Sequence, residues 1–256
     1  MKNFRVVALL AGLLVFSGVA HADDFTLADP STGTFSGEGF GTLVTILSLQ
    51  VTDGSTEAGA VAPANAVTLG TAPSGFGTYG DCGATVGLCA GDATNQGGGH
   101  TGVITAAVLT DPTGLNMNAD SQFGLLYNVN QQGGDLNTYL NEPTPFTVYF
   151  YDSDGNVLFS ASYAGRTDPF APTENNGQGT SGWLFILNGT EFHDNFNQIA
   201  NIGMDGTAGN ANDGADNWSV VNAGGSNPVP EPATLVLLGT GLLGVAGKLR
   251  RRMKKS

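Results

Sequence analysis

The central part of this chain almost lacks basic residues. The 256-residue sequence has 9 Lys and Arg, of which only Arg166 lies between Asp23 and Val229. The same span holds 21 of the 22 acidic residues, so its net charge is −20. A surface this acidic repels nucleic acid and anionic membrane surfaces, and it attracts cations. Nucleic-acid binding is therefore excluded for this part of the chain.

Cysteine is also scarce, with Cys82 and Cys89 as the two residues of this type. They lie in a Gly-rich segment with six residues between them, and outside the reducing cytoplasm such a pair is expected to be oxidised. A metal site is the alternative, but two thiols without a nearby histidine cluster make a poor zinc site. We predict a disulfide that closes a small surface loop.

Residues suited to nucleophilic catalysis are few. The sequence contains 3 histidines, and no Gly-x-Ser-x-Gly pattern surrounds a serine. His193 stands beside Asp194 in an expected helix, where an exposed surface position is its simplest interpretation. We predict that the chain has no enzymatic activity and no obligatory cofactor, with a secreted hydrolase as the least favoured alternative.

The first 22 residues have the layout of a secretory signal peptide. Lys2 and Arg5 precede an apolar run over residues 6–16, and residues 20–22 read Ala-His-Ala, a small-x-small cleavage site. An N-terminal membrane anchor is the alternative, but the apolar run is too short to span a bilayer comfortably. We predict export, with cleavage before Asp23.

The body that follows, residues 23–227, has the composition of a β-protein. Its abundant Gly, Asn, Thr, Ser and Asp favour turns and short strands over long helices, and its length suits one all-β domain. The hairpin signal is clearest at residues 146–151 and 157–163, which flank an Asp-Gly turn. Strands are also expected at residues 40–51, 66–69, 103–109, 124–130, 181–187 and 218–221.

One short helix is expected near residue 190. Thr190 is a suitable N-cap, and Phe192, Phe196 and Ile199 follow at helical spacing. The predicted fold class is mainly β: an antiparallel, jelly-roll-like β-sandwich with this helix, an N-terminal signal helix and a C-terminal transmembrane helix.

Two segments have the oxygen-rich composition of calcium sites. Asp152, Asp154 and Asn156 stand at alternate positions like the opening of a Ca²⁺ loop, but the required downstream Glu is absent. A ligand-free hairpin turn is the favoured interpretation, and calcium is the weaker one. Residues 205–216 are rich in Gly and Asp but lack a nonapeptide repeat, and a polar loop is favoured there too.

Carbohydrate binding is the alternative function from a different class, and it depends on aromatic side chains. Aromatic residues on strands more often belong to a core, so this signal is weak. The candidate stacking residues are Trp183, Trp218, Tyr127, Tyr139, Tyr149, Tyr151 and Tyr163.

The C-terminal tail has three parts. The residues Pro230, Glu231 and Pro232 precede an apolar run over residues 233–247, and a basic cluster follows that includes Arg250, Arg251 and Arg252. Fifteen helical residues span about 22 Å, short of a bilayer core of about 30 Å. The basic end is expected to stay in the cytoplasm, which leaves the acidic body outside. A buried core helix is the alternative.

This combination resembles the PEP-CTERM sorting domain of exported bacterial proteins, over about residues 228–252. The resemblance implies a Gram-negative bacterium that makes extracellular polysaccharide, and an exosortase, a membrane protease, that recognises Pro230, Glu231 and Pro232. It further implies an intermediate held in the inner membrane by the tail helix before delivery to the cell surface or extracellular matrix. Sortase anchoring is the alternative, but no Leu-Pro-x-Thr-Gly occurs. Our leading hypothesis is a non-enzymatic surface or matrix protein associated with exopolysaccharide, with a carbohydrate-binding module as the alternative.

Overall fold

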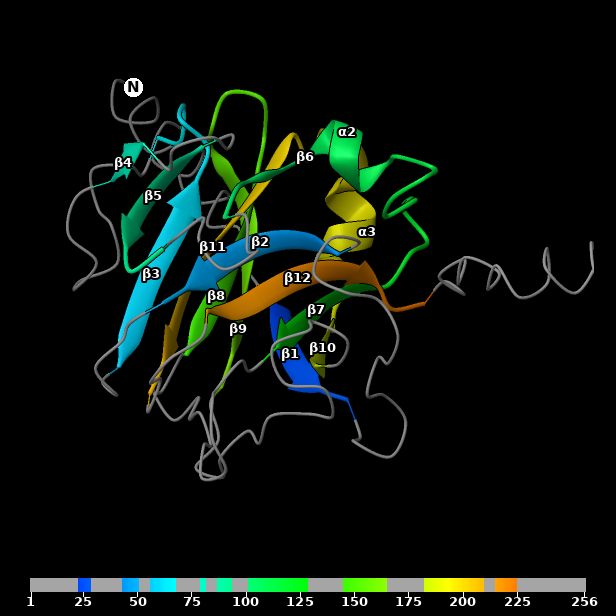
Figure 1. Ribbon diagram of the computed structural model, residues 1–256. Coiled ribbons are helices and arrows are strands. Elements are labelled where there is room, and N and C mark those ends of the chain that lie inside the picture. Colours follow the sequence, from blue (N-terminus) through cyan, green and yellow to red (C-terminus); the bar gives the residue numbers. More distant parts are fainter. Residues whose placement is uncertain are drawn as a thin grey trace, which may run out of the picture.

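The computed structural model describes residues 23–28, 43–50, 56–67, 79–81, 87–93, 101–128, 145–164, 182–209 and 215–224. Short strands dominate these residues (Figure 1). The strands are β1 (Asp23–Leu27), β2 (Val44–Leu49), β3 (Glu57–Ala62), β4 (Gly80–Asp81), β5 (Leu88–Gly91), β6 (Ile104–Thr105), β7 (Phe123–Asn128), β8 (Phe146–Tyr151), β9 (Val157–Tyr163), β10 (Trp183–Leu187), β11 (Asn201–Ala208) and β12 (Asp216–Asn222). The helices are α2 (Ala106–Leu109), α3 (Glu191–Asn195) and the 3₁₀ turn η1 (Phe196–Gln198).

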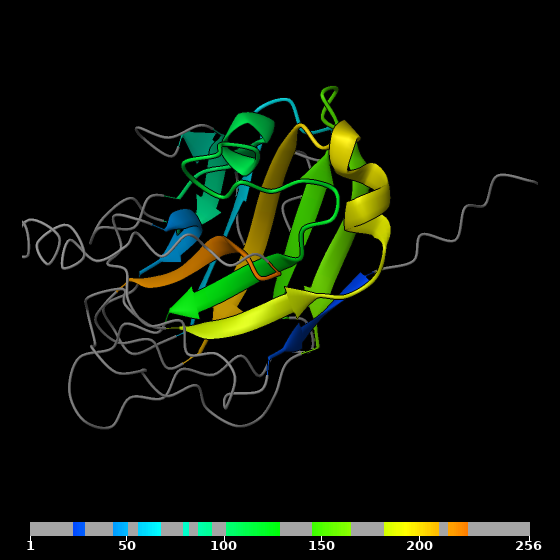
Figure 2. The same cartoon turned by 90° about the vertical axis from the view of Figure 1, so that its right-hand side faces the viewer.

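The strands form one continuous sheet in the order β2-β12-β7-β10-β1-β9-β8-β11-β3-β5-β4, with β6 paired to β11. The first strand, β1, joins two halves, because it pairs antiparallel with β10 on one side and parallel with β9 on the other. The sheet curls around its core, as the two views in Figures 1 and 2 show. The mainly β class is confirmed, but a sandwich of two separate sheets is not, since β1 makes the halves continuous.

A single large core fills the curl. Phe25 of β1 packs against Phe123 of β7 and Phe146 of β8, with ring centroids 6.2 and 5.4 Å apart. Phe146 also contacts Phe185 of β10 edge-on at 5.1 Å. Aromatic groups of this size contribute most of the burial energy, and edge-on contacts add to it. The strand that links the two halves of the sheet therefore also links their cores.

The free edge of β2 is closed by side-chain and backbone contacts. The hydroxyl of the buried Thr101 accepts a hydrogen bond from Ser48 N at 3.0 Å and donates one to Ser48 O at 3.2 Å. Further along the same edge, Leu49 forms an isolated bridge with Ala93. Backbone groups need partners when they are buried, and these contacts supply them on the side of β2 where the described residues contain no paired strand.

Most of the predicted strands are confirmed, with two corrections, and the predicted helix is confirmed with one. Residues 66–67 form a turn, and the nearby strand is β3 instead, an Ala- and Gly-rich strand without β-branched residues except Val61. In the predicted strand 103–109, only β6 is extended, because Thr105 caps α2 by accepting a hydrogen bond from Val108 N. The helix near residue 190 is confirmed as α3, but the Thr190 side chain makes no capping hydrogen bond.

Both expected terminal helices lie outside the described residues. These are the signal helix in residues 1–22 and the transmembrane helix in residues 228–252. Within the part of the chain that the structure describes, no helix combines the length and apolarity needed to cross a membrane.

Candidate functional site

The described chain ends where β12 leads toward the tail, beside the turn formed by residues 118–122. Ala223 N donates to Gln122 O at 2.8 Å, directly after β12 ends. The Asn222 side chain adds a hydrogen bond from Nδ2 to Ser121 Oγ at 3.4 Å. These contacts fix the exit of the chain against the 118–122 turn.

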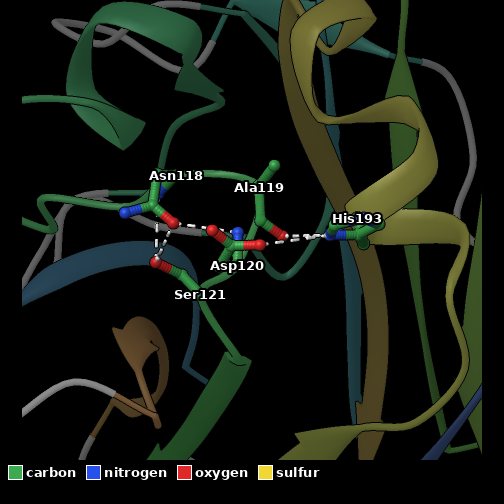
Figure 3. Close-up of polar contacts among 5 residues, drawn as sticks. All are labelled: Asn118, Ala119, Asp120, Ser121 and His193. Carbon is green, nitrogen blue, oxygen red and sulfur yellow. Dashed lines mark hydrogen bonds and ion pairs between the residues drawn. The ribbon is translucent and has the colours of Figure 1, made fainter.

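The turn itself is held by its own polar side chains. Asn118 Oδ1 accepts from Asp120 N at 2.8 Å, and Ser121 Oγ accepts from Asn118 N at 3.0 Å (Figure 3). Asn and Ser favour such turns because their short side chains bond to nearby backbone groups. The turn is therefore pre-formed by local sequence and leaves the Asp120 carboxylate exposed.

Helix α3 contributes His193 to the same end of the body. Its Nδ1 donates to Ala119 O at 2.9 Å and lies 3.8 Å from Asp120 Oδ1 (Figure 3). The neighbouring Phe192 is buried and packs against Phe123 at 5.3 Å, which anchors the helix to β7. We name this group, residues 118–122 with His193, the exit surface. The His193 and Asp120 side chains are 58% and 91% exposed, so the pair is a surface contact.

A second polar cluster lies on the opposite face of the sheet from the core. Tyr149 of β8 donates a hydrogen bond from its hydroxyl to Asp205 Oδ2 of β11 at 2.6 Å. Tyr79 and Tyr149 pack against a small buried group of Ala62, Ala66 and Tyr151. We name Tyr79, Tyr149, Tyr151 and Asp205 the tyrosine–aspartate cluster.

Burial dominates the electrostatics of this cluster. Desolvation raises the pKa of Asp205 to about 6, against hydrogen bonds from Tyr149 and Thr147 that lower it. Burial also raises the pKa of Tyr149 and of Tyr79, and the nearby Asp205 charge adds to both shifts. Sequence reasoning missed this cluster, because Asp205 is followed by glycine and resembles a turn residue.

The Asp152, Asp154 and Asn156 segment forms the β8–β9 hairpin turn. Asp152 Oδ1 accepts from the backbone N–H of Asp154 and of Asn156, both at 2.9 Å. Its Oδ2 accepts from Asn156 Nδ2 at 3.0 Å, and these bonds lower the pKa of Asp152. Both carboxylate oxygens are thus engaged by the turn, which favours the hairpin interpretation over a calcium loop.

The second calcium candidate, residues 205–216, begins and ends inside strands. Asp205 belongs to the tyrosine–aspartate cluster, and the buried Asp216 accepts a hydrogen bond from Tyr127 at 3.0 Å. Residues 210–214 lie outside the described residues. Across the described ranges, no group of three or more His, Cys, Asp or Glu side chains gathers in a way that suits a metal ion.

The candidate stacking aromatics divide into core and surface. Trp218 and Tyr127 stack at 4.4 Å and are fully buried, and Tyr163 packs on Phe146 at 5.6 Å. Trp183 and Tyr149 keep partial exposure, and Tyr139 lies outside the described residues.

The remaining predicted residues can be placed only in part. Cys89 lies in β5 and is not a free cysteine. Cys82 lies outside the described residues, so the pairing of the two stays a prediction. The same holds for the positions of Pro230, Glu231 and Pro232 and of Arg250, Arg251 and Arg252.

Comparison with known families identifies the tail that follows β12 in the sequence. Residues 228–252 match the PEP-CTERM protein-sorting motif. The chain carries a PEP-CTERM sorting motif. Comparisons with curated proteins and with solved structures gave no match to the chain.

The PEP-CTERM motif confirms the resemblance drawn from Pro230, Glu231 and Pro232. It implies an exported protein of a Gram-negative bacterium that is processed by exosortase and passes through a membrane-anchored intermediate. The exit surface contacts Ala223, which stands next to Gly224, the last described residue before this PEP-CTERM tail.

Proposed function

We propose that this chain is a non-enzymatic protein of the cell surface or extracellular matrix that is delivered by exosortase and associates with exopolysaccharide. The observation that carries the proposal is the PEP-CTERM motif over residues 228–252, placed behind a body of opposite charge. Basic residues gather in the signal peptide and the tail, whereas the body between them has a net charge of −20. Once both ends are removed, the delivered product is almost purely acidic.

Cations link this body to the polymer in our proposal. Many exposed carboxylates attract divalent ions without a dedicated site, and the same ions bridge to acidic sugars. The hairpin carboxylate of Asp152 is engaged by its own turn, so we assign the effect to the overall surface charge. Such binding weakens as salt concentration rises.

The body is suited to a structural role in the matrix. The two halves of the curled sheet share one core and, in our proposal, act together as a sandwich-like unit with a jelly-roll-like outline. The Cys82–Cys89 disulfide is part of the same proposal, since it would brace the segment that precedes β5.

Co-fractionation tests this function. The mature protein is expressed in an exosortase-containing strain, and the matrix is extracted with and without a chelator of divalent cations. We expect the protein in the polysaccharide fraction and its release by chelation. A protein found wholly in the medium, with no difference between strains with and without polysaccharide synthesis, would contradict the proposal.

A second candidate function is direct carbohydrate binding at the tyrosine–aspartate cluster. The observation that favours it is the partial exposure of Tyr79 and Tyr149 on the outer face of the sheet, beside Asp205. Aromatic rings next to a hydrogen-bonded carboxylate provide stacking and polar contacts. A glycan array with the wild type and Tyr149→Ala tests it, with Thr207→Ala on the neighbouring strand as control. Absence of any saturable signal for the wild type would remove this candidate.

A further inference from the structure

The tail can reach only a limited distance from the exit surface. The last described residue is Gly224, and Pro230 is six positions further along the chain, which allows a span of at most about 20 Å. Ala233, where the apolar run begins, is nine residues away, at most about 30 Å even for a fully extended chain. Any enzyme that holds Pro230 must therefore work close to the end of β12.

The opposite end of the body lies at the limit of that reach. Strand β12 has 7 residues, which span about 20 Å from Asp216 to Asn222 at the usual rise per residue. Thr56 lies near this distant end of β12. Asp216, the first residue of β12, pairs with Leu49, and Leu49 packs beside Gly59 of β3. Thr56 directly precedes β3. The segment from Gly224 to Pro230 would have to be fully extended to run back along the strand. The exit surface is thus the side of the folded body that faces the processing enzyme.

The charge of the exit surface indicates which of two neighbours, the membrane lipid or the enzyme, it contacts. Asp120 and Asp194 are exposed there, and Asp111 is exposed in the segment that leads to the turn. Helices α2 and α3 lie at this same end of the sheet in both views (Figures 1 and 2). No Lys or Arg occurs in residues 101–128 or 182–224, so nearby basic side chains from these segments do not offset the charge. Anionic lipid headgroups repel such a surface, whereas a basic protein surface attracts it.

We propose that the exit surface, residues 118–122 with His193, docks on the extracytoplasmic face of exosortase while the tail is anchored in the membrane. The proposal rests on exosortase sorting, which the PEP-CTERM motif implies. The pre-formed turn presents the Asp120 carboxylate outward, and the contact from His193 to Ala119 O holds the turn against α3. A basic patch on the enzyme is the partner chemistry that fits this surface.

Site-specific photocrosslinking in cells tests the proposal. The full chain carries p-benzoylphenylalanine in place of Asp120, of Thr56 or of Ala233, in a strain whose exosortase is catalytically inactive so that the anchored intermediate accumulates. Asp120 and Thr56 are both exposed, so neither replacement disturbs the core. Ala233 lies in the sorting tail and serves as the positive control for the enzyme–tail complex.

We expect adducts with exosortase from positions 120 and 233, and several-fold fewer from position 56. Adducts from position 233 with equal yields from 120 and 56 would overturn the docking surface and leave the sorting role intact. Adducts from position 120 that contain lipid in place of enzyme would also overturn the docking surface. Absence of enzyme adducts from all three positions would instead contradict sorting by exosortase, and the docking proposal would fall with it.

Discussion

Replacing Asp205 by asparagine should remove the contribution of one buried carboxylate to the pH dependence of the body's stability. Asp205 is 7% exposed on β11 and accepts a hydrogen bond from Tyr149 at 2.6 Å. Burial raises its pKa from 3.8 to about 6 in the folded protein. Asparagine has nearly the same shape and still accepts the tyrosine hydrogen bond, but it carries no charge to desolvate.

The sign and size follow from proton linkage. The folded state binds the Asp205 proton more tightly than the unfolded state. Protonation of Asp205 therefore adds to the free energy of unfolding, and the contribution is largest below pH about 4. That stability is lost as the pH rises from about 4 through about 6. A shift of about two pKa units corresponds to about 3 kcal/mol in the free energy of unfolding. Loss of the hydrogen bonds from Thr147 should cost Asp205→Asn about 1 kcal/mol at every pH, which leaves the slope unchanged.

Urea unfolding of the mature protein at a series of pH values between 4 and 8 measures this effect. The difference between wild type and Asp205→Asn cancels carboxylates common to both, so it isolates the single group. We expect the variant to gain about 2 kcal/mol on the wild type between pH 4 and pH 7.5, because the unfolded state is already partly ionised at pH 4. Tyr149→Phe removes a bond that lowers the Asp205 pKa and should move the transition to higher pH. A difference between wild type and Asp205→Asn that stays constant over the range would show that folding does not raise the pKa of Asp205.

Three further predictions concern the fold. Gly155→Ala should cost at least about 1 kcal/mol in urea unfolding, because Gly155 has φ +83° and an added methyl meets Asn65 O. Gly80→Ala is the control, because an added Cβ there meets nothing within 4 Å. An equal loss of stability in both variants would show that the backbone conformation and contact at Gly155 are not the cause. Phe25→Ala should cost about 3–5 kcal/mol by the same measurement, and a loss below about 1 kcal/mol would show that β1 does not link the two cores. Cys82 and Cys89 should resist alkylation until reduced, and reduction should cost about 2–3 kcal/mol; rapid labelling of the native protein would rule the disulfide out.

The β8–β9 hairpin was predictable because its signals are local. Alternating apolar residues face the core over Phe146–Tyr151, and the turn that joins the strands is built by Asp152 and Gly155, four residues or fewer from their partners. Strand β3 was missed for the converse reason. Its alanines and glycine have low strand propensity, and Gly59 is needed because a side chain there would collide with Leu49.

Long-range contacts limit how much of the tyrosine–aspartate cluster and of the sheet order can be predicted from the sequence. Asp205 is buried beside Tyr149, which is 56 residues away in the sequence. The residue pattern of neither segment indicates that the two come into contact. Strand β1 joins two halves of the sheet through partners at Ala161 and Leu187, so the continuous curl was not deducible from strand patterns. The sorting motif was deducible, since recognition depends on a short contiguous sequence.

In the function proposed above, exosortase releases the acidic body from its PEP-CTERM tail. Intact-mass analysis of the protein from the cell surface or matrix, with and without a functional exosortase, tests it most directly. When exosortase is active, we expect a form that starts at Asp23 and ends near Pro230, Glu231 and Pro232. When it is not, we expect a membrane-bound form with the whole tail. Glu231→Ala should accumulate the same unprocessed form. A surface protein that keeps residues 233–256 in the presence of active exosortase would contradict release of the body by this enzyme.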